Sequence, residues 1–149
     1  MKQENIRRTL DAFYLAKRIR DMLPPLPDGV AESYIRFLDT IQMLEEKNEH
    51  VRISDVGKAL NLQRPGVTRT IKEMESRGYL KKQASEEDGR VTYITITETG
   101  AELSDRFNTK VFETLSDHLT DISDDDVEVL IRTTKKIYDI ICSGRIQLG

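Results

Sequence analysis

Residues 51–100 read VRISDVGKALNLQRPGVTRTIKEMESRGYLKKQASEEDGRVTYITITETG. Along this stretch the spacing of the apolar residues changes from a helical period to an alternating one. The first part predicts a short helix over 53–60, whose apolar face would consist of Ile53, Val56, Ala59 and Leu60. Gly57 stands where we expect a second helix to cross so closely that no side chain would fit.

A second helix is predicted at about 64–77, after a turn at 61–63 of the length that joins the two helices of a helix-turn-helix. Pro65 suits its first turn, where a missing N–H costs nothing, and Gly78 suits the position after its end. The buried stripe is predicted to be Val67, Ile71 and Met74. The other face carries long donors and one hydroxyl and no acid, namely Arg64, Thr68, Arg69 and Lys72. We expect this face to enter the major groove of duplex DNA.

After Gly78 the alternation predicts a β-hairpin over about 80–97. Asp88-Gly89 is typical of a hairpin tip, because glycine tolerates the positive φ that such a turn needs. An arginine at the tip of a slender ribbon can enter a minor groove, so Arg90 is predicted to do so. The Asp88 carboxylate is predicted to hold the Arg90 guanidinium in a bidentate pair.

In this order of elements, residues 51–100 resemble the DNA-binding core of the MarR family of bacterial transcription regulators. The family's wing pattern is Asp, any residue and Arg, then alternating apolar residues, then Thr-Glu-x-Gly. Asp88-Gly89-Arg90, Ile94, Ile96 and Thr97-Glu98-Thr99-Gly100 match it. The chain departs from the family at the start of the second helix, where Gln63, Pro65 and Gly66 replace the usual Ser or Thr. The base preference of relatives therefore does not transfer to this chain.

The resemblance implies a mainly α fold with a small antiparallel β wing, formed by one domain over residues 1–149. A winged helix-turn-helix at 31–97, with its recognition helix at about 64–77 and its wing at about 80–97, would be flanked by helical dimerisation regions at 1–30 and 98–149. The residues expected to contact DNA are Gln63, Arg64, Pro65, Thr68, Arg69, Lys72, Asp88 and Arg90.

The flanking segments are predicted to form amphipathic helices. The first carries the stripe Ile6, Leu10, Phe13, Tyr14 and Lys17 and must end before the prolines of 24–27. A helix from about Ala31 to Lys47 follows. Thr97 or Thr99 is expected to cap the long helix after the wing, and Ser123 the last helix, with three aspartates against its positive end.

These apolar stripes predict a homodimer in which the terminal helices pack across a two-fold axis. Such a dimer would space its recognition helices about 34–36 Å apart and would bind a pseudo-palindromic operator. The alternative is that the first and last helices cover each other within one chain.

The distribution of charge agrees with a DNA partner although the net charge is −3. Residues 51–97 hold nine Lys and Arg against six Asp and Glu, whereas 98–149 hold six against eleven. Acidic ends repel phosphate and so favour docking through the middle of the chain. A solvated charged surface is the alternative interpretation.

The sequence gives little support for an enzyme or a metal protein. His50 and His118 are isolated, and no glycine-rich phosphate loop occurs, so neither a cofactor nor a metal is expected. The single Cys142 excludes an intramolecular disulfide and fits a reducing cytoplasm; a small apolar filler is its default role, and a redox switch the alternative. No membrane or targeting segment is recognisable.

The sequence therefore predicts a cytoplasmic transcription regulator, a repressor whose DNA affinity a small molecule lowers. Family members commonly bind such a ligand between the dimerisation helices and the winged module, which here implies Phe13, Tyr34, Phe37 and Phe112. The same aromatic residues also suit a core. The alternative function is a winged-helix protein-interaction module that does not bind DNA, in which the basic residues would have no purpose.

Overall fold

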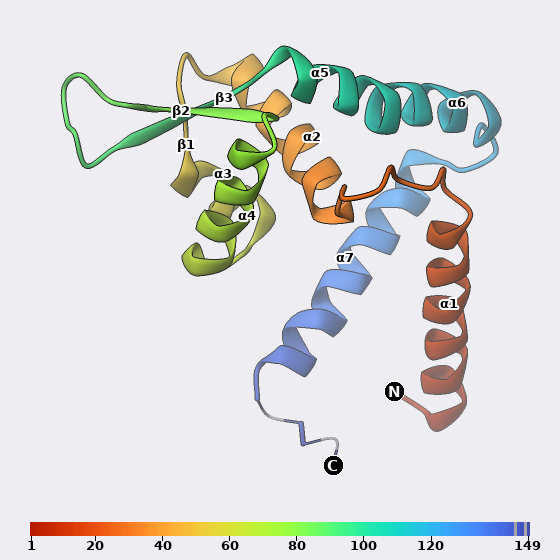
Figure 1. The fold of residues 1–149 in the computed structure, drawn as a ribbon. Coiled ribbons are helices and arrows are strands. Elements are labelled where there is room, and N and C mark those ends of the chain that lie inside the picture. The colour runs from red at the N-terminus through yellow and green to blue at the C-terminus, as the bar shows by residue number, and fades with distance from the viewer. Residues whose placement is uncertain (145, 148) are drawn as a thin grey trace. The chain divides into compact units, whose positions relative to one another are not determined.

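The computed structural model describes residues 1–144, 146, 147 and 149. It is mainly helical with one small antiparallel sheet, which confirms the predicted fold class (Figure 1). The elements are α1 Gln3–Asp21, α2 Glu32–Lys47, β1 Val51–Arg52, α3 Ile53–Leu60, α4 Arg64–Ser76, β2 Leu80–Ala84, β3 Thr92–Ile96, α5 Glu98–Ser104, the π-helical segment η1 Asp105–Thr109, α6 Lys110–His118 and α7 Asp124–Cys142. The chain forms two compact units, 1–109 and 110–149.

The sheet of the first unit has the order β1-β3-β2, with both pairs antiparallel. Val51 pairs with Ile94, and Leu80 pairs with Ile96, so the short strand before α3 is bonded to the second strand of the hairpin. Figure 1 shows β2 and β3 as a hairpin that extends away from the helices of this unit. The wing is thus fixed at its base and exposed at its tip.

One hydrophobic core holds α2, α3, α4 and the sheet together. Its buried members are Tyr34, Phe37, Leu38, Ile41, Val51, Val56, Leu60, Val67, Ile71, Met74, Leu80 and Ile94. The predicted stripe of α4 is therefore confirmed. On α3 the prediction for Ala59 was wrong: Ala59 is exposed, because Val56 and Leu60 already fill the contact with the core.

Two glycines contact their neighbours in ways the sequence did not predict. A Cβ built on Gly57 would meet Leu62 O and Val67 Cγ2 at 3.5 Å, which is ordinary contact, so the expectation of a crossing too close for a side chain was wrong. The α3–α4 turn keeps the helices far enough apart for a methyl group. At Gly100, by contrast, a Cβ would lie 2.2 Å from the carbonyl oxygen of Tyr79. Gly100 is the position where α5 and the turn before β2 leave no room for a side chain.

The ends of α4 follow the local rules. Gln63 is the N-cap, and Pro65 lies in the first turn, where it removes no helical hydrogen bond. At the other end Gly78 has φ +81°, and the N–H of Tyr79 donates to Met74 O at 2.9 Å. This is a Schellman-type end, in which the left-handed glycine lets the chain turn into β2.

The helix after the wing begins with Thr97, whose Oγ1 accepts the N–H of Gly100 at 3.1 Å. This confirms Thr97, of the two predicted caps. The buried Ser104 donates to Gln42 Oε1 at 2.6 Å, and the buried Asn108 donates to Ile35 O at 3.0 Å. These hydrogen bonds join α5 and η1 to α2 and satisfy polar atoms that burial would otherwise penalise.

Helices α1, α6 and α7 expose apolar side chains to solvent in the single chain. No residue of α1, α6 or α7 is buried. Ser123 caps α7 as predicted, accepting the N–H of Asp126 at 3.1 Å. Among the described residues, no helix is both long and apolar enough to cross a membrane.

Candidate nucleic-acid interface

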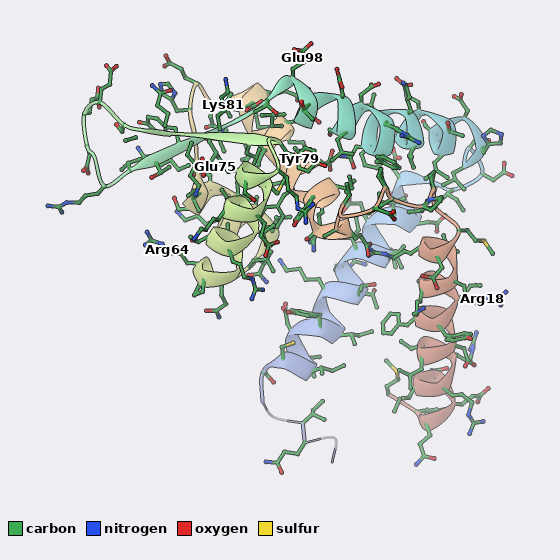
Figure 2. The ribbon with its side chains drawn as sticks, viewed as in Figure 1. Arg18, Arg64, Glu75, Tyr79, Lys81 and Glu98 are labelled. Atoms are coloured by element: carbon green, nitrogen blue, oxygen red, sulfur yellow. The ribbon has the colours of Figure 1, made fainter. Side chains whose placement is uncertain are left out.

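The face of α4 away from the core is polar and open. Val67, Ile71 and Met74 fix its orientation by packing inward. The residues predicted to contact DNA from this helix are all exposed, namely Gln63, Arg64, Pro65, Thr68, Arg69 and Lys72. Figure 2 shows the Arg64 side chain pointing away from the ribbon. The structure therefore brings these residues together on one helix surface.

The two acidic residues of α4 are engaged with other elements. Glu73 Oε2 accepts the hydroxyl of Tyr34 at 2.9 Å, and Glu75 Oε1 lies 3.4 Å from Lys82 Nζ. In the part of the chain that the structure describes, Arg64, Arg69 and Lys72 have no ion pair. The positive charge of this face is therefore not neutralised within the chain, which suits a surface that meets phosphate.

The wing tip is a loop over 85–91 that side chains hold in shape. The N–H of Ser85 donates to Val91 O at 2.9 Å and closes the loop. Ser85 Oγ accepts the N–H of Glu87 at 3.3 Å. The Oδ1 of Asp88 accepts the backbone N–H of Arg90 at 3.0 Å.

Two predictions about this tip were wrong. Gly89 does not have a positive φ, because the loop is longer than a two-residue turn and has no left-handed position there. Asp88 is not paired with the Arg90 guanidinium in any ion pair of the described residues; its carboxylate is used by the backbone two residues on. Arg90 itself is exposed, so its guanidinium extends from a tip whose backbone is fixed.

The four aromatic residues implied as a ligand site fall into two groups. Tyr34 and Phe37 belong to the core, with 4% and 2% of their surface exposed. Phe13 and Phe112 are exposed and lie in the first and second units, respectively. A ligand role for this set stays a prediction.

The histidines and the cysteine occupy unremarkable positions. The ring of His50 stacks on Tyr93 at 4.4 Å between centroids, and His118 Nδ1 lies 2.7 Å from Thr114 O. Among the described residues, no group of three or more His, Cys, Asp or Glu is placed to hold a metal ion. Cys142 is exposed, so the interpretation of it as a small buried filler does not hold within one chain.

The segment that holds α4 and the wing tip is similar to a known protein family. Residues 29–91 match the model of the MarR family. Over this segment the chain is similar to the MarR family. The MarR-family match covers α2, α3, α4 and the wing tip, and therefore contains every residue singled out above for DNA contact.

Proteins with similar sequences carry names of a related kind. The chain is 25% identical over 116 residues to an HTH-type transcriptional regulator, YdgJ, of Bacillus subtilis (strain 168), covering 75% of this chain and 68% of that one. It is 27% identical over 105 residues to the HTH-type transcriptional regulator SarZ of Staphylococcus haemolyticus (strain JCSC1435), covering 70% and 69%. The family and these relatives are transcription regulators and not enzymes.

Solved structures share the fold across nearly the whole chain. The structure of Streptococcus pneumoniae FabT in complex with DNA superposes with a TM-score of 0.64 at 18% identity, covering 95% of this chain and 99% of that one. At this identity the likeness shows the fold. It includes the helices outside the matched segment, which the MarR family model does not reach.

Removal of an arginine from α4 and removal of the arginine from the wing should change DNA affinity and base preference in different ways. Arg69→Ala should cost about 1–3 kcal/mol of binding and relax the preference at particular base pairs, because the major groove distinguishes all four pairs. Arg90→Ala should weaken binding to most operators and lose preference only at flanking A·T pairs, because the minor groove distinguishes little else. Binding of each variant to a library of operator variants measures both effects.

Asp88→Ala is the companion to the wing variant. It should act in the same direction as Arg90→Ala but less strongly, because it removes a support of the Arg90 backbone and not the contact itself. All three variants should melt within a few degrees of the wild type, since the side chains are exposed. Wild-type affinity of Arg90→Ala would contradict a role of the wing in binding.

Proposed function

We propose that this chain is a sequence-specific, duplex-DNA-binding transcription regulator that acts as a homodimer. The observation that carries the proposal is the outer face of α4, where three cations are unpaired among the described residues while both acids of the helix are bonded elsewhere. A helix of this kind fits the major groove, and the fixed wing tip with Arg90 fits the adjacent minor groove. A module that only bound proteins would have no use for this arrangement.

The dimer is supported by the apolar surface of the outer helices. Leu10 is 61% exposed, Leu130 is 65% exposed and Tyr138 is 57% exposed in the single chain. Side chains of this size on helices with no buried residue need a partner surface to leave water. A two-fold arrangement of such helices presents two copies of α4 to successive major grooves of a pseudo-palindromic site.

The repressor role and a small-molecule effector belong to the same proposal. A dimer of this size that is bound at a promoter site blocks transcription by occluding that site. An effector that binds the dimer and favours another spacing of the recognition helices lowers its affinity for the site. Thermal-shift screening of the purified protein against small metabolites, followed by DNA binding in their presence, tests this part.

The experiment that tests the function is selection of genomic DNA. Purified protein is mixed with fragmented genomic DNA at moderate salt, and the retained fragments are sequenced. We expect a small set of fragments that share an inverted repeat with half-sites one helical turn apart. Retention that is equal for all fragments would contradict sequence-specific binding.

The oligomeric state gives a separate prediction. The molar mass in solution should be twice the chain mass of 17.2 kDa, and deletion of residues 1–22 should leave aggregated or unfolded protein. Leu10→Glu tests the interface with the full chain: it should lower the dimer population, whereas Arg8→Glu on the polar side of α1 should not. Light scattering across a concentration series measures both. A well-behaved wild-type monomer at micromolar concentration would contradict the dimer.

A further inference from the structure

The hydrogen bond between Tyr34 and Glu73 joins two helices across the first unit. The Tyr34 hydroxyl donates to Glu73 Oε2 at 2.9 Å, over a separation of 39 residues. Tyr34 lies on α2 and is 4% exposed, so its ring is anchored in the core. Glu73 lies on α4, on a part of the helix that is exposed. A residue anchored in the core thus holds an exposed carboxylate of α4.

Glu73 has another possible partner on its own helix. Arg69 precedes it by four residues, and side chains at this spacing are neighbours on the helix surface. Oppositely charged residues at this spacing form ion pairs worth about 0.2–0.5 kcal/mol in isolated helices. Among the described residues no ion pair joins Arg69 to Glu73, and the Glu73 carboxylate is instead bonded to Tyr34.

The other arginine near Glu73 is held by a different contact. Arg77 follows Glu73 by four residues, and its guanidinium lies over the Tyr34 ring at 5.9 Å from the centroid. A Cβ on Gly29 would lie 2.7 Å from Arg77 Nη1, so the guanidinium is also packed against the segment between α1 and α2. Arg77 is therefore held against Tyr34 and Gly29, whereas Arg69, on the other side of Glu73 along the helix, has no ion pair among the described residues.

We propose that Tyr34 is a positioning residue for DNA binding, because its hydroxyl holds the Glu73 carboxylate away from Arg69 and so leaves the Arg69 guanidinium available to DNA. This inference rests on the proposed function. Burial, and after it the hydrogen bond to Glu73, raises the pKa of the Tyr34 phenol above its ordinary value. The phenol therefore remains a protonated donor throughout the neutral range, and the arrangement persists at the pH at which DNA is bound.

The test removes the hydroxyl and keeps the ring. Tyr34→Phe should weaken binding about two- to fivefold at low salt, because the freed carboxylate pairs with Arg69 and brings its charge toward phosphate. The probe is a fluorescein-labelled duplex that the wild-type protein enriches from a randomised pool, and anisotropy measures its binding. Tyr79→Phe is the matched control: its ring lies 6.3 Å from that of Tyr34, and the substitution leaves Glu73 untouched, so binding should not change.

Rescue separates positioning from a general structural effect. Tyr34→Phe combined with Glu73→Gln should bind within twofold of the wild type, because no carboxylate remains to occupy Arg69. In an Arg69→Ala background, Tyr34→Phe should have no further effect. If the double variant with Glu73→Gln binds as weakly as Tyr34→Phe alone, or if Tyr34→Phe binds like the wild type, the inference is wrong.

A second variant keeps the inference testable if Tyr34→Phe does not fold. Glu73→Asp keeps the charge but is one methylene too short to reach Tyr34 in the same way, and it should weaken binding as Tyr34→Phe does. Glu73→Gln alone should leave binding near the wild-type value. Equal binding by Glu73→Asp and Glu73→Gln would overturn the inference. A wild-type protein that enriches no duplex at all would instead overturn the proposed function.

Discussion

Raising the salt concentration from about 50 to 200 mM should weaken operator binding by a factor of about a thousand to a hundred thousand. Binding of a protein that neutralises about six to ten phosphates releases the counterions of those phosphates, so its affinity falls steeply with salt. The proposed dimer presents Arg64, Arg69 and Lys72 of α4 twice, together with Arg90 of each wing. Titration of a labelled operator at four or five salt concentrations gives the slope of log affinity against log salt.

Lys72→Ala provides the internal check on this slope. A lysine contacts phosphate as a point charge and carries little base specificity, so its removal should weaken binding evenly across sequences. Because the dimer carries the residue twice, the slope should fall in magnitude by about two. A response to salt that is flat in the wild type would mean that the face of α4 does not dock on a DNA backbone.

Gly100→Ala should destabilise the protein by about 3 kcal/mol or more, which exceeds the usual cost of an added methyl group in a packed site. The new Cβ would lie 2.2 Å from Tyr79 O and 3.0 Å from Ile96 Cγ2. The Tyr79 carbonyl cannot turn away freely, because it accepts the N–H of Thr97 at 3.1 Å, and Thr97 in turn caps α5. The clash therefore disrupts the contacts at the junction of α4, the wing and α5.

Thermal unfolding followed by circular dichroism measures this effect. A loss of about 3 kcal/mol corresponds to a melting temperature lower by about 6–12 °C for a chain of this size. Gly57→Ala is the matched control, since its Cβ would meet its neighbours at 3.5 Å and alanine favours a helix by up to about 1 kcal/mol. That variant should melt at or above the wild-type temperature. Equal melting of the two variants would contradict the packing described at Gly100.

The elements of the fold were predictable where their causes are local. The place of Pro65 in the first turn of α4, the left-handed Gly78 after its end and the Ser123 cap of α7 each depend on neighbours within a few residues. The recognition helix, predicted at about 64–77, is found at Arg64–Ser76. The exposed face of α4 follows from the same periodicity, because its opposite face is apolar at helical spacing.

Contacts between distant parts of the chain were not predictable from one sequence. The close crossing expected at Gly57 and the positive φ expected at Gly89 were both wrong, although Gly89 does lie in the tip of the hairpin. The glycine that has no room for a side chain is Gly100, whose neighbour Tyr79 lies far away in sequence, in the turn between α4 and β2. The hydrogen bond from Tyr34 to Glu73 likewise joins two helices, and no local sequence pattern around either residue predicts it.

The wing loop also bears on how such regulators diverge. Ser85 and Asp88 hold the loop through their own side chains, and a Cβ on Gly89 would meet nothing within 4 Å. A side chain at position 89 would therefore not disturb the hairpin, so a duplicated gene can change this residue without changing the fold of the wing. If the wing tip contacts DNA as proposed, single substitutions in this loop change the preference at the edge of the operator, whereas substitutions on α4 also have to preserve the core beneath it.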